Sequence, residues 1–103
     1  MDITVGKEGE KILVTIRGKV DEAGADQLKD SFFSILQGKG SQVELNFQDT
    51  THIGSSGIGN ILLFYKNMAI NDSKLSIINL SPVLFELFQE LKLDTLFSIS
   101  RRS

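Results

Sequence analysis

The chain has no cysteine and, in 103 residues, only one histidine and one proline. Without cysteine it forms no disulfide and carries no thiol chemistry. His52 alone leaves a histidine-based zinc site without its usual ligands, so we expect no metal and no cofactor. The 11 basic and 13 acidic residues give a net charge of -2, without a block of one sign. That balance indicates neither a nucleic acid nor an anionic membrane surface as a partner.

Signals for export or membrane insertion are also missing from the sequence. The N-terminal residues have neither a basic region nor an apolar run of signal-peptide length, and no segment approaches a membrane span. We therefore expect a cytoplasmic protein. No stretch is rich in serine and proline or low in complexity, which predicts one domain covering residues 1–103.

What the chain does have is an alternation of strand and helix patterns. Asp21 should cap the first helix, Gly38 and Gly40 should end it, and Ser81 should cap the third. The order predicts an α/β fold, with a mostly parallel sheet, an N-terminal hairpin and helices in right-handed βαβ crossovers. The fourth strand is apolar on both faces, as in a strand covered on both sides, and residues 100–103 should be mobile. The expected strands are 3–5, 12–16, 43–47, 75–80 and 96–99, with a turn at 6–9, and the expected helices are 22–37, 55–70 and 82–91.

Ser55 and Ser56 lie between glycines where the third strand pattern gives way to the second helix. The first turn of a helix has unpaired backbone N–H groups and the positive end of the helix dipole, so it accepts a phosphate well. We expect Ser55 to cap this helix, and Gly57 and Gly59 to leave the hydroxyls unshielded. An exposed hydroxyl here predicts a site of reversible phosphorylation. The face expected to pack on the sheet consists of Ile58, Ile61, Leu62, Tyr65 and Ala69.

This order of elements, with GKVD at residues 18–21 and IGSSGIG at 53–59, resembles the STAS domain and, more narrowly, the bacterial anti-sigma factor antagonists. The resemblance implies that Ser56 is phosphorylated by a cognate anti-sigma factor that is also a serine kinase. The unphosphorylated protein would bind that kinase and free the sigma factor, and a PP2C-type phosphatase would reset the cycle. It also implies that Asp21 lies near Ser56. Most members carry an aspartate before the serine pair, where this chain has Gly54.

A docking surface for the kinase is expected on the side of the second helix that faces away from the sheet. Ser56, Asn60, Leu63 and Asn67 recur at helical steps and would form a strip there. A phosphate adds about 1.5 to 2 negative charges, and its desolvation and repulsion in a neutral or acidic interface should weaken binding. The predicted partner-binding residues are Asp21, Ser55, Ser56, Gly57, Asn60, Leu63 and Asn67.

Other interpretations of the same residues stay open. Ser56 and Asp21 could be no more than helix caps, and a STAS scaffold could bind its partner without a phosphorylation switch. A small-ligand or nucleotide module is a further alternative, although neither G-x-G-x-x-G nor a P-loop is present. We expect no enzyme, because Ile58 breaks the G-x-S-x-G pattern of hydrolases and His52 alone makes no triad. Three aromatic residues outside the apolar stripes could belong to the core or to a partner surface: Phe33, Phe64 and Phe85.

Overall fold

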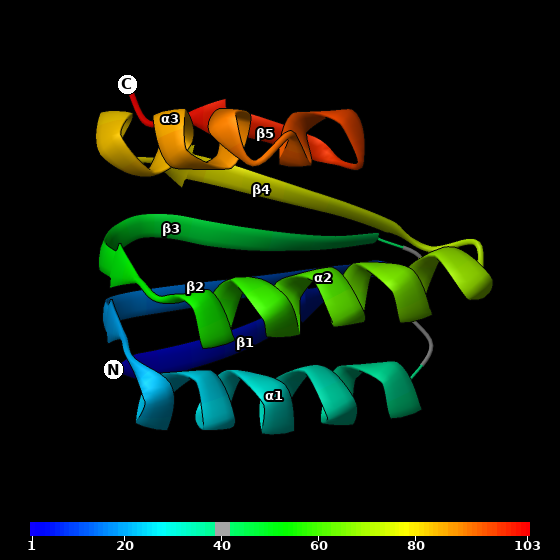
Figure 1. The fold of residues 1–103 in the computed structure, drawn as a ribbon. Coiled ribbons are helices and arrows are strands. Elements are labelled where there is room, and N and C mark those ends of the chain that lie inside the picture. The colour runs from blue at the N-terminus through cyan, green and yellow to red at the C-terminus, as the bar shows by residue number, and fades with distance from the viewer. Residues whose placement is uncertain (39–41) are drawn as a thin grey trace.

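Five strands form one sheet in the order β1-β2-β3-β4-β5, which is also their order along the chain (Figure 1). The computed structural model describes residues 1–38 and 42–103. The first two strands are antiparallel and each later pair is parallel, so the predicted hairpin and mostly parallel sheet are confirmed. The elements are β1 (Asp2–Glu8), β2 (Lys11–Val20), α1 (Glu22–Gln37), β3 (Gln42–Ile53), α2 (Ser55–Ile70), β4 (Lys74–Leu80), α3 (Pro82–Glu90), the short 3-10 helix η1 (Leu93–Thr95) and β5 (Ser98–Arg101).

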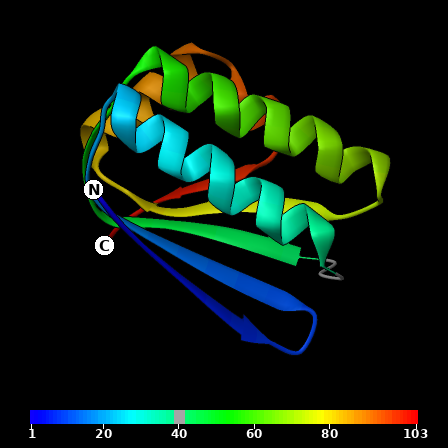
Figure 2. The same cartoon turned by 90° about the horizontal axis from the view of Figure 1, so that it is seen from below.

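The helices α1, α2 and α3 all cover the same face of the sheet, as Figure 2 shows. Each crossover connection leads to the next strand in the same direction across the sheet. Because such connections share one handedness, their helices all lie on the same face of the sheet. Side chains on β2 alternate accordingly, because Val14 and Ile16 are buried whereas Leu13 and Arg17 on the other face are exposed. The expectation that β4 would be covered on both faces was wrong, since Ile78 on the open face is only partly buried.

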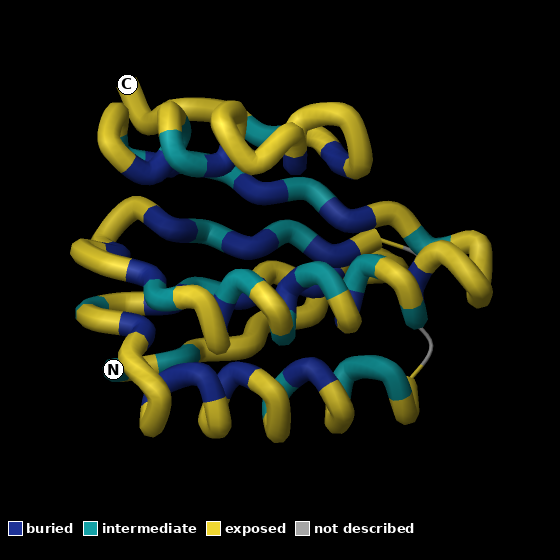
Figure 3. The backbone as a smooth tube through the Cα atoms, viewed as in Figure 1, coloured by how far each residue is buried: buried dark blue, intermediate teal, exposed yellow. Residues whose placement is uncertain are grey.

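The buried residues of the helices and the sheet form one hydrophobic core, and Figure 3 shows where they lie along the backbone. Phe32 of α1 stacks on Phe64 of α2 with ring centroids 4.1 Å apart, and Phe47 of β3 meets Phe88 of α3 edge-on with centroids 6.2 Å apart. Aromatic pairs in these geometries add about 0.5 to 1.5 kcal/mol beyond the area they bury. The first pair therefore holds α1 against α2, and the second holds α3 against the sheet.

The starts of α1 and α3 agree with the prediction because side-chain caps fix them. Asp21 and Ser81 each accept a hydrogen bond from a backbone N–H in the following turn, at 2.9 and 3.2 Å. Gly38 is the C-cap of α1, and Gly40 lies outside the described residues. Within residues 1–38 and 42–103, no helix is long and apolar enough to cross a membrane.

Two strands of the amino-terminal half differ from their predicted limits. β3 continues to Ile53 because its last residues pair with the end of β2, where Val20 lies opposite Ile53 after two irregularities of register. The hairpin turn is also shorter than expected, since Glu8 pairs directly with Lys11. Gly9 opens this turn with φ +62°, a conformation that glycine adopts without a steric penalty.

The carboxyl-terminal strand lies later than predicted because η1 occupies part of the connection after α3. Arg101 and Arg102, which we expected to be mobile, both contact the rest of the domain. The backbone N–H of Arg102 donates to β4 at 2.8 Å, and its Nη1 donates to the carbonyl of Gln48 at 2.8 Å. The guanidinium carbon of Arg101 lies 5.4 Å from the ring centroid of Phe85. The prediction of a free stub was therefore wrong.

Candidate functional site

The paired serines open α2 directly after β3, and both side chains are exposed. Gly54 is the N-cap and the cap has no side-chain hydrogen bond, so the expectation that Ser55 would cap the helix was wrong. Ser55 already belongs to the helix, whereas a capping side chain must come from the residue before it. The backbone of Gly54 accepts from the N–H of Ile58 at 3.1 Å and donates to the carbonyl of Val20 at 2.9 Å. Neither serine hydroxyl is used to cap the helix.

Gly57 is buried under the first turn of α2, against the ends of β2 and β3. A Cβ at this position would lie 2.8 Å from Cγ1 of Val20 and 2.9 Å from Cγ1 of Ile53, closer than carbon atoms can approach. Our expectation that it uncovers the serines was therefore wrong, because its role is to let the helix approach the sheet. Gly59 differs, since nothing lies within 4 Å of the Cβ it lacks.

The buried face of α2 is rotated from the predicted one. Ala69 is exposed and Ile58 is only partly buried, because Phe64 turns toward α1 to stack on Phe32. Phe64 is therefore a core residue, whereas the side chain of Phe33 is 66% exposed. Phe85 is partly buried beside α3's contact with β5. The residues of α2 that are buried are Gly57, Ile61, Phe64 and Met68.

Ser56 lines a polar cleft between the first turns of α1 and α2, with a volume of about 470 Å³. We call it the Ser56 cleft. Asn60 lines it, and its Nδ2 donates to the carbonyl of Ala25 at 2.9 Å, which ties the two helices together. Ser55 is not among the lining residues, so the two neighbouring hydroxyls have different surroundings. The cleft is lined by Glu22, Ala25, Asp26, Lys29, Ser56 and Asn60.

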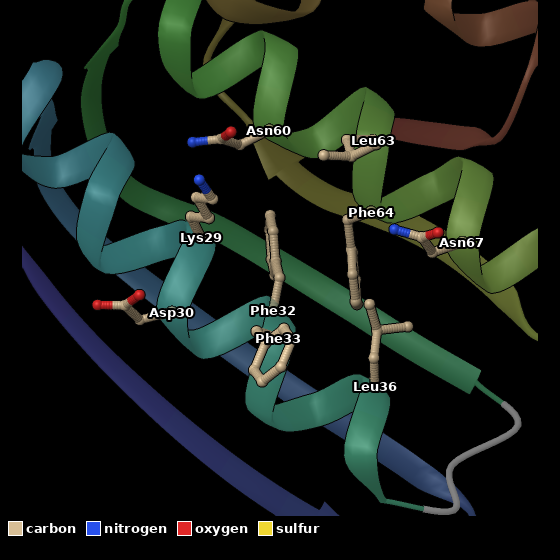
Figure 4. A pocket seen from close by; sticks show the side chains of 9 residues that line it. All are labelled: Lys29, Asp30, Phe32, Phe33, Leu36, Asn60, Leu63, Phe64 and Asn67. Carbon is tan, nitrogen blue, oxygen red and sulfur yellow. The ribbon is translucent and has the colours of Figure 1, made fainter.

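A second, apolar groove of about 330 Å³ continues between the same two helices (Figure 4). Lys29 and Asn60 line both hollows, which makes them the boundary between the polar and the apolar part. Leu63, 53% exposed, and Asn67 line this groove, so the predicted strip on α2 faces α1 along its length. The groove is lined by Lys29, Asp30, Phe32, Phe33, Leu36, Asn60, Leu63, Phe64 and Asn67.

Asp21 is exposed and serves as the cap of α1, as predicted. Its Oδ1 accepts from the N–H of Gly24 at 2.9 Å, and this hydrogen bond lowers the pKa of the carboxyl below its ordinary value of 3.8. It is not among the residues that line the Ser56 cleft; the next residue, Glu22, is. The structure thus gives Asp21 a structural role and places its neighbour at the serine.

The STAS domain family model matches residues 3–103. The chain belongs to the STAS domain family. Among solved structures of this fold, SpoIIAA of Bacillus in the phosphorylated form has 19% identity and a TM-score of 0.78, covering 95% of this chain and 90% of its own. An anti-sigma factor antagonist from Mycobacterium paratuberculosis has 14% identity and a TM-score of 0.86, covering 96% and 84%.

A protein with a different description shares the fold as well. The sulfate transporter family protein from Wolinella succinogenes has 14% identity and a TM-score of 0.78, with 90% of this chain and 78% of that one covered. Identities this low show a common fold and nothing finer. The function of this STAS domain must therefore be argued from its own residues.

Sequence reasoning missed the contribution of α1 to the site in this STAS domain. Glu22, Asp26 and Lys29 recur at steps of four and three, so the sequence does place them on one face of α1. Nothing in the sequence says that this face adjoins the start of α2, so these charges alone predict no more than a solvated surface. The signal existed, but its meaning depended on how two helices lie beside each other.

The chemistry available at this site is that of an exposed hydroxyl in a charged cleft. Glu22 and Asp26 make the cleft acidic, and Lys29 supplies the cation that partly balances them. In the described part of the chain, neither serine hydroxyl has a hydrogen bond to His52, which is itself exposed at the end of β3.

Proposed function

We propose that this STAS domain is an anti-sigma factor antagonist, switched by phosphorylation at Ser56. In its unphosphorylated form it binds an anti-sigma factor that is also a serine kinase, and the sigma factor is thereby freed. Phosphorylation ends this binding, and a PP2C-type phosphatase restores it. The protein works in the cytoplasm by binding rather than by catalysis.

The observation that carries the proposal is the state of Ser56 at the start of α2. Its side chain is exposed and takes no part in capping, in a helix whose N-cap is a glycine. The comparison with SpoIIAA supports the same conclusion, because that protein is described as an anti-sigma factor antagonist and is known in unphosphorylated and phosphorylated forms.

Phosphoryl transfer to Ser56 would change charge without changing the fold. The Oγ atom forms a bond to the γ-phosphorus of ATP, ADP leaves, and the hydroxyl proton passes to a base of the kinase. The product carries about 1.5 to 2 negative charges at neutral pH. Glu22 and Asp26 already make this region acidic, so a partner that fits the neutral hydroxyl meets concentrated negative charge after modification.

The docking surface runs from Ser56 along the side of α2 that faces α1. Leu63 offers exposed apolar area, and Asn67 lines the same groove. Asn60 contributes mainly by holding α1 in place, since its amide is bonded to Ala25. Gly57 is buried and supports the serines from beneath, while Ser55 and Asp21 are exposed but line neither the Ser56 cleft nor the apolar groove.

Binding to the cognate kinase tests the proposal directly. The affinity of Ser56→Ala should stay near that of the wild type, whereas Ser56→Asp should lose about a thousandfold, which corresponds to about 4 kcal/mol. Ser55→Asp is the matched control, because it adds the same charge one residue away, outside the cleft. Equal binding of Ser56→Ala and Ser56→Asp would contradict the switch.

A second candidate function is a STAS regulator that binds its partner without any phosphate. The observation that favours it is Gly54, which stands where the resembling antagonists usually carry an aspartate. Incubation with ATP and the candidate kinase separates the two functions. The gain of one phosphate on the intact mass, mapped to Ser56, favours the switch, whereas retained binding with no added phosphate favours the second candidate.

A further inference from the structure

The geometry points to Lys29 of α1 as the side chain that pairs with the phosphate once Ser56 is modified. This inference rests on the proposed phosphorylation and adds a second residue to the switch. Lys29 and Ser56 come from different helices but line the same cleft. The phosphate would therefore be held within the chain, as an ion pair between α1 and α2, and the pair exists only in the modified form.

The ammonium group of Lys29 is available for such a contact. Within residues 1–38 and 42–103 it forms no ion pair with a carboxylate, although Asp26 and Asp30 lie on the same helix. Figure 4 shows its side chain extended toward α2 beside Asn60, whereas Asp30 points away from α2. Asn60 follows Ser56 by one helical turn, so a phosphate on Ser56 extends toward the same space.

The charges that line the cleft determine how strongly Lys29 would affect the ionisation of the phosphate. Glu22 and Asp26 disfavour the dianion of a phosphoserine, and Lys29 is the one cation among the residues that line the cleft. Other charged groups lie near these turns: Asp21 caps α1, with Lys19 and the N-terminal ammonium acting on it, and His52 lies at the end of β3. Without Lys29 the charged residues lining the cleft would be carboxylates alone, and the second pKa of the phosphate would rise above the usual value of about 6.

Lys29 also distinguishes the two serines. Ser55 precedes Ser56 by about 100° of helical rotation and does not line the cleft. A phosphate on Ser55 would project into solvent, away from α1. We therefore expect a substitution at Lys29 to shift the second pKa of a phosphate on Ser56, but not that of a phosphate on Ser55.

The test incorporates phosphoserine during translation, so no kinase is needed. Phosphorus NMR then follows the second pKa of the phosphate at position 56 in the wild-type background and in Lys29→Gln. Loss of the ammonium should raise this pKa by about half a unit, and Lys29→Arg should keep it near the wild-type value. Glu22→Gln should lower it, because a repelling charge is removed. Lys29 and Glu22 are both exposed, so the variants should fold.

The same titration with phosphoserine at position 55 is the control, and Lys29→Gln should leave it unchanged. An unchanged pKa at position 56, or equal shifts at both positions, would overturn the pairing. Such a result would leave the proposed function intact, because that rests on kinase binding by the Ser56 variants. Conversely, a kinase that ignores Ser56 would refute the proposed function without affecting the measured ion pair.

Discussion

The starts of α1 and α2 are neighbours that use their polar residues differently. β2 and β3 end side by side, with Val20 paired to Ile53, and each helix begins just beyond. At α1 the Asp21 side chain caps the helix, whereas at α2 the cap is Gly54 and makes no side-chain bond. A polar group that serves the fold is not available to a partner. The uncapped start, where neither hydroxyl serves as a cap, is the one to which our proposal assigns the switch.

The largest expected change in the free energy of unfolding comes from disturbing the packing beneath the first turn of α2. Gly57→Ala should destabilise the domain by about 1 to 2 kcal/mol, because the clash with Val20 and Ile53 exceeds the gain in helix propensity. Urea unfolding measures the change. Gly59→Ala is the matched control on the same helix, and it should stabilise by up to about 1 kcal/mol, since open space surrounds that position. Equal effects of the two substitutions would show that Gly57 is not tightly packed.

Removing the cap of α1 should have a smaller effect than Gly57→Ala. Asp21→Ala leaves the N–H of Gly24 without its side-chain acceptor, so thermal unfolding should occur at a lower temperature. Ser55→Ala, at the start of α2, should leave the melting temperature nearly unchanged, because that hydroxyl does not cap. A similar loss for both variants would remove the difference between the two helix starts.

The charge on Asp21 makes the stability of α1 depend on pH, in a direction that its pKa fixes. The folded pKa lies below 3.8, so the carboxylate stabilises the fold fully above that pH, and the contribution disappears as the pH falls through the folded value. The difference in unfolding free energy between the wild type and Asp21→Asn should therefore narrow as the pH falls from about 5. It should disappear once the pH is below the folded pKa of Asp21. Denaturant unfolding across this range measures it, and a constant gap would contradict the assignment.

The smallest expected change in stability comes from giving α2 an aspartate N-cap like that of α1. Gly54 has ordinary extended dihedrals, and the nearest atom to an added Cβ is the carbonyl of Val20 at 3.6 Å, so an aspartate fits there. Gly54→Asp should raise the free energy of unfolding by a few tenths of a kcal/mol through a new cap. Gly54→Ala adds a Cβ without an acceptor and should not stabilise. If both variants behave alike, the aspartate is not capping.

The elements that the sequence predicted well are those with local causes. Asp21 and Ser81 cap the helices that follow them, and alternation along β2 marks its buried side, because these features depend on residues a few positions apart. The one-sided cover of β4 could not be predicted, since Ile78 looks like a core residue until the paths of all the crossovers are known. The extension of β3 to Ile53 likewise depends on pairing with a distant strand.

The site divides in the same way between local and distant causes. The exposure of Ser56 at the start of a helix followed from the sequence around it, and the structure agrees. The burial of Gly57 depends on the side chains of Val20 and Ile53, and the place of Lys29 in the Ser56 cleft depends on the packing of α1 beside α2. Neither contact is encoded in the spacing of residues along one segment.

The uncovered face of the sheet provides an attachment point on the opposite side from the helices. Ser98 of β5 is exposed there, in register with Ser76 of β4, while its neighbour Ile99 packs into the core. Because the chain has no cysteine, Ser98→Cys introduces one thiol. A sensor surface coupled to that thiol would attach the molecule through the open face of the sheet. Every immobilised copy would then present α1 and α2 to a partner in solution.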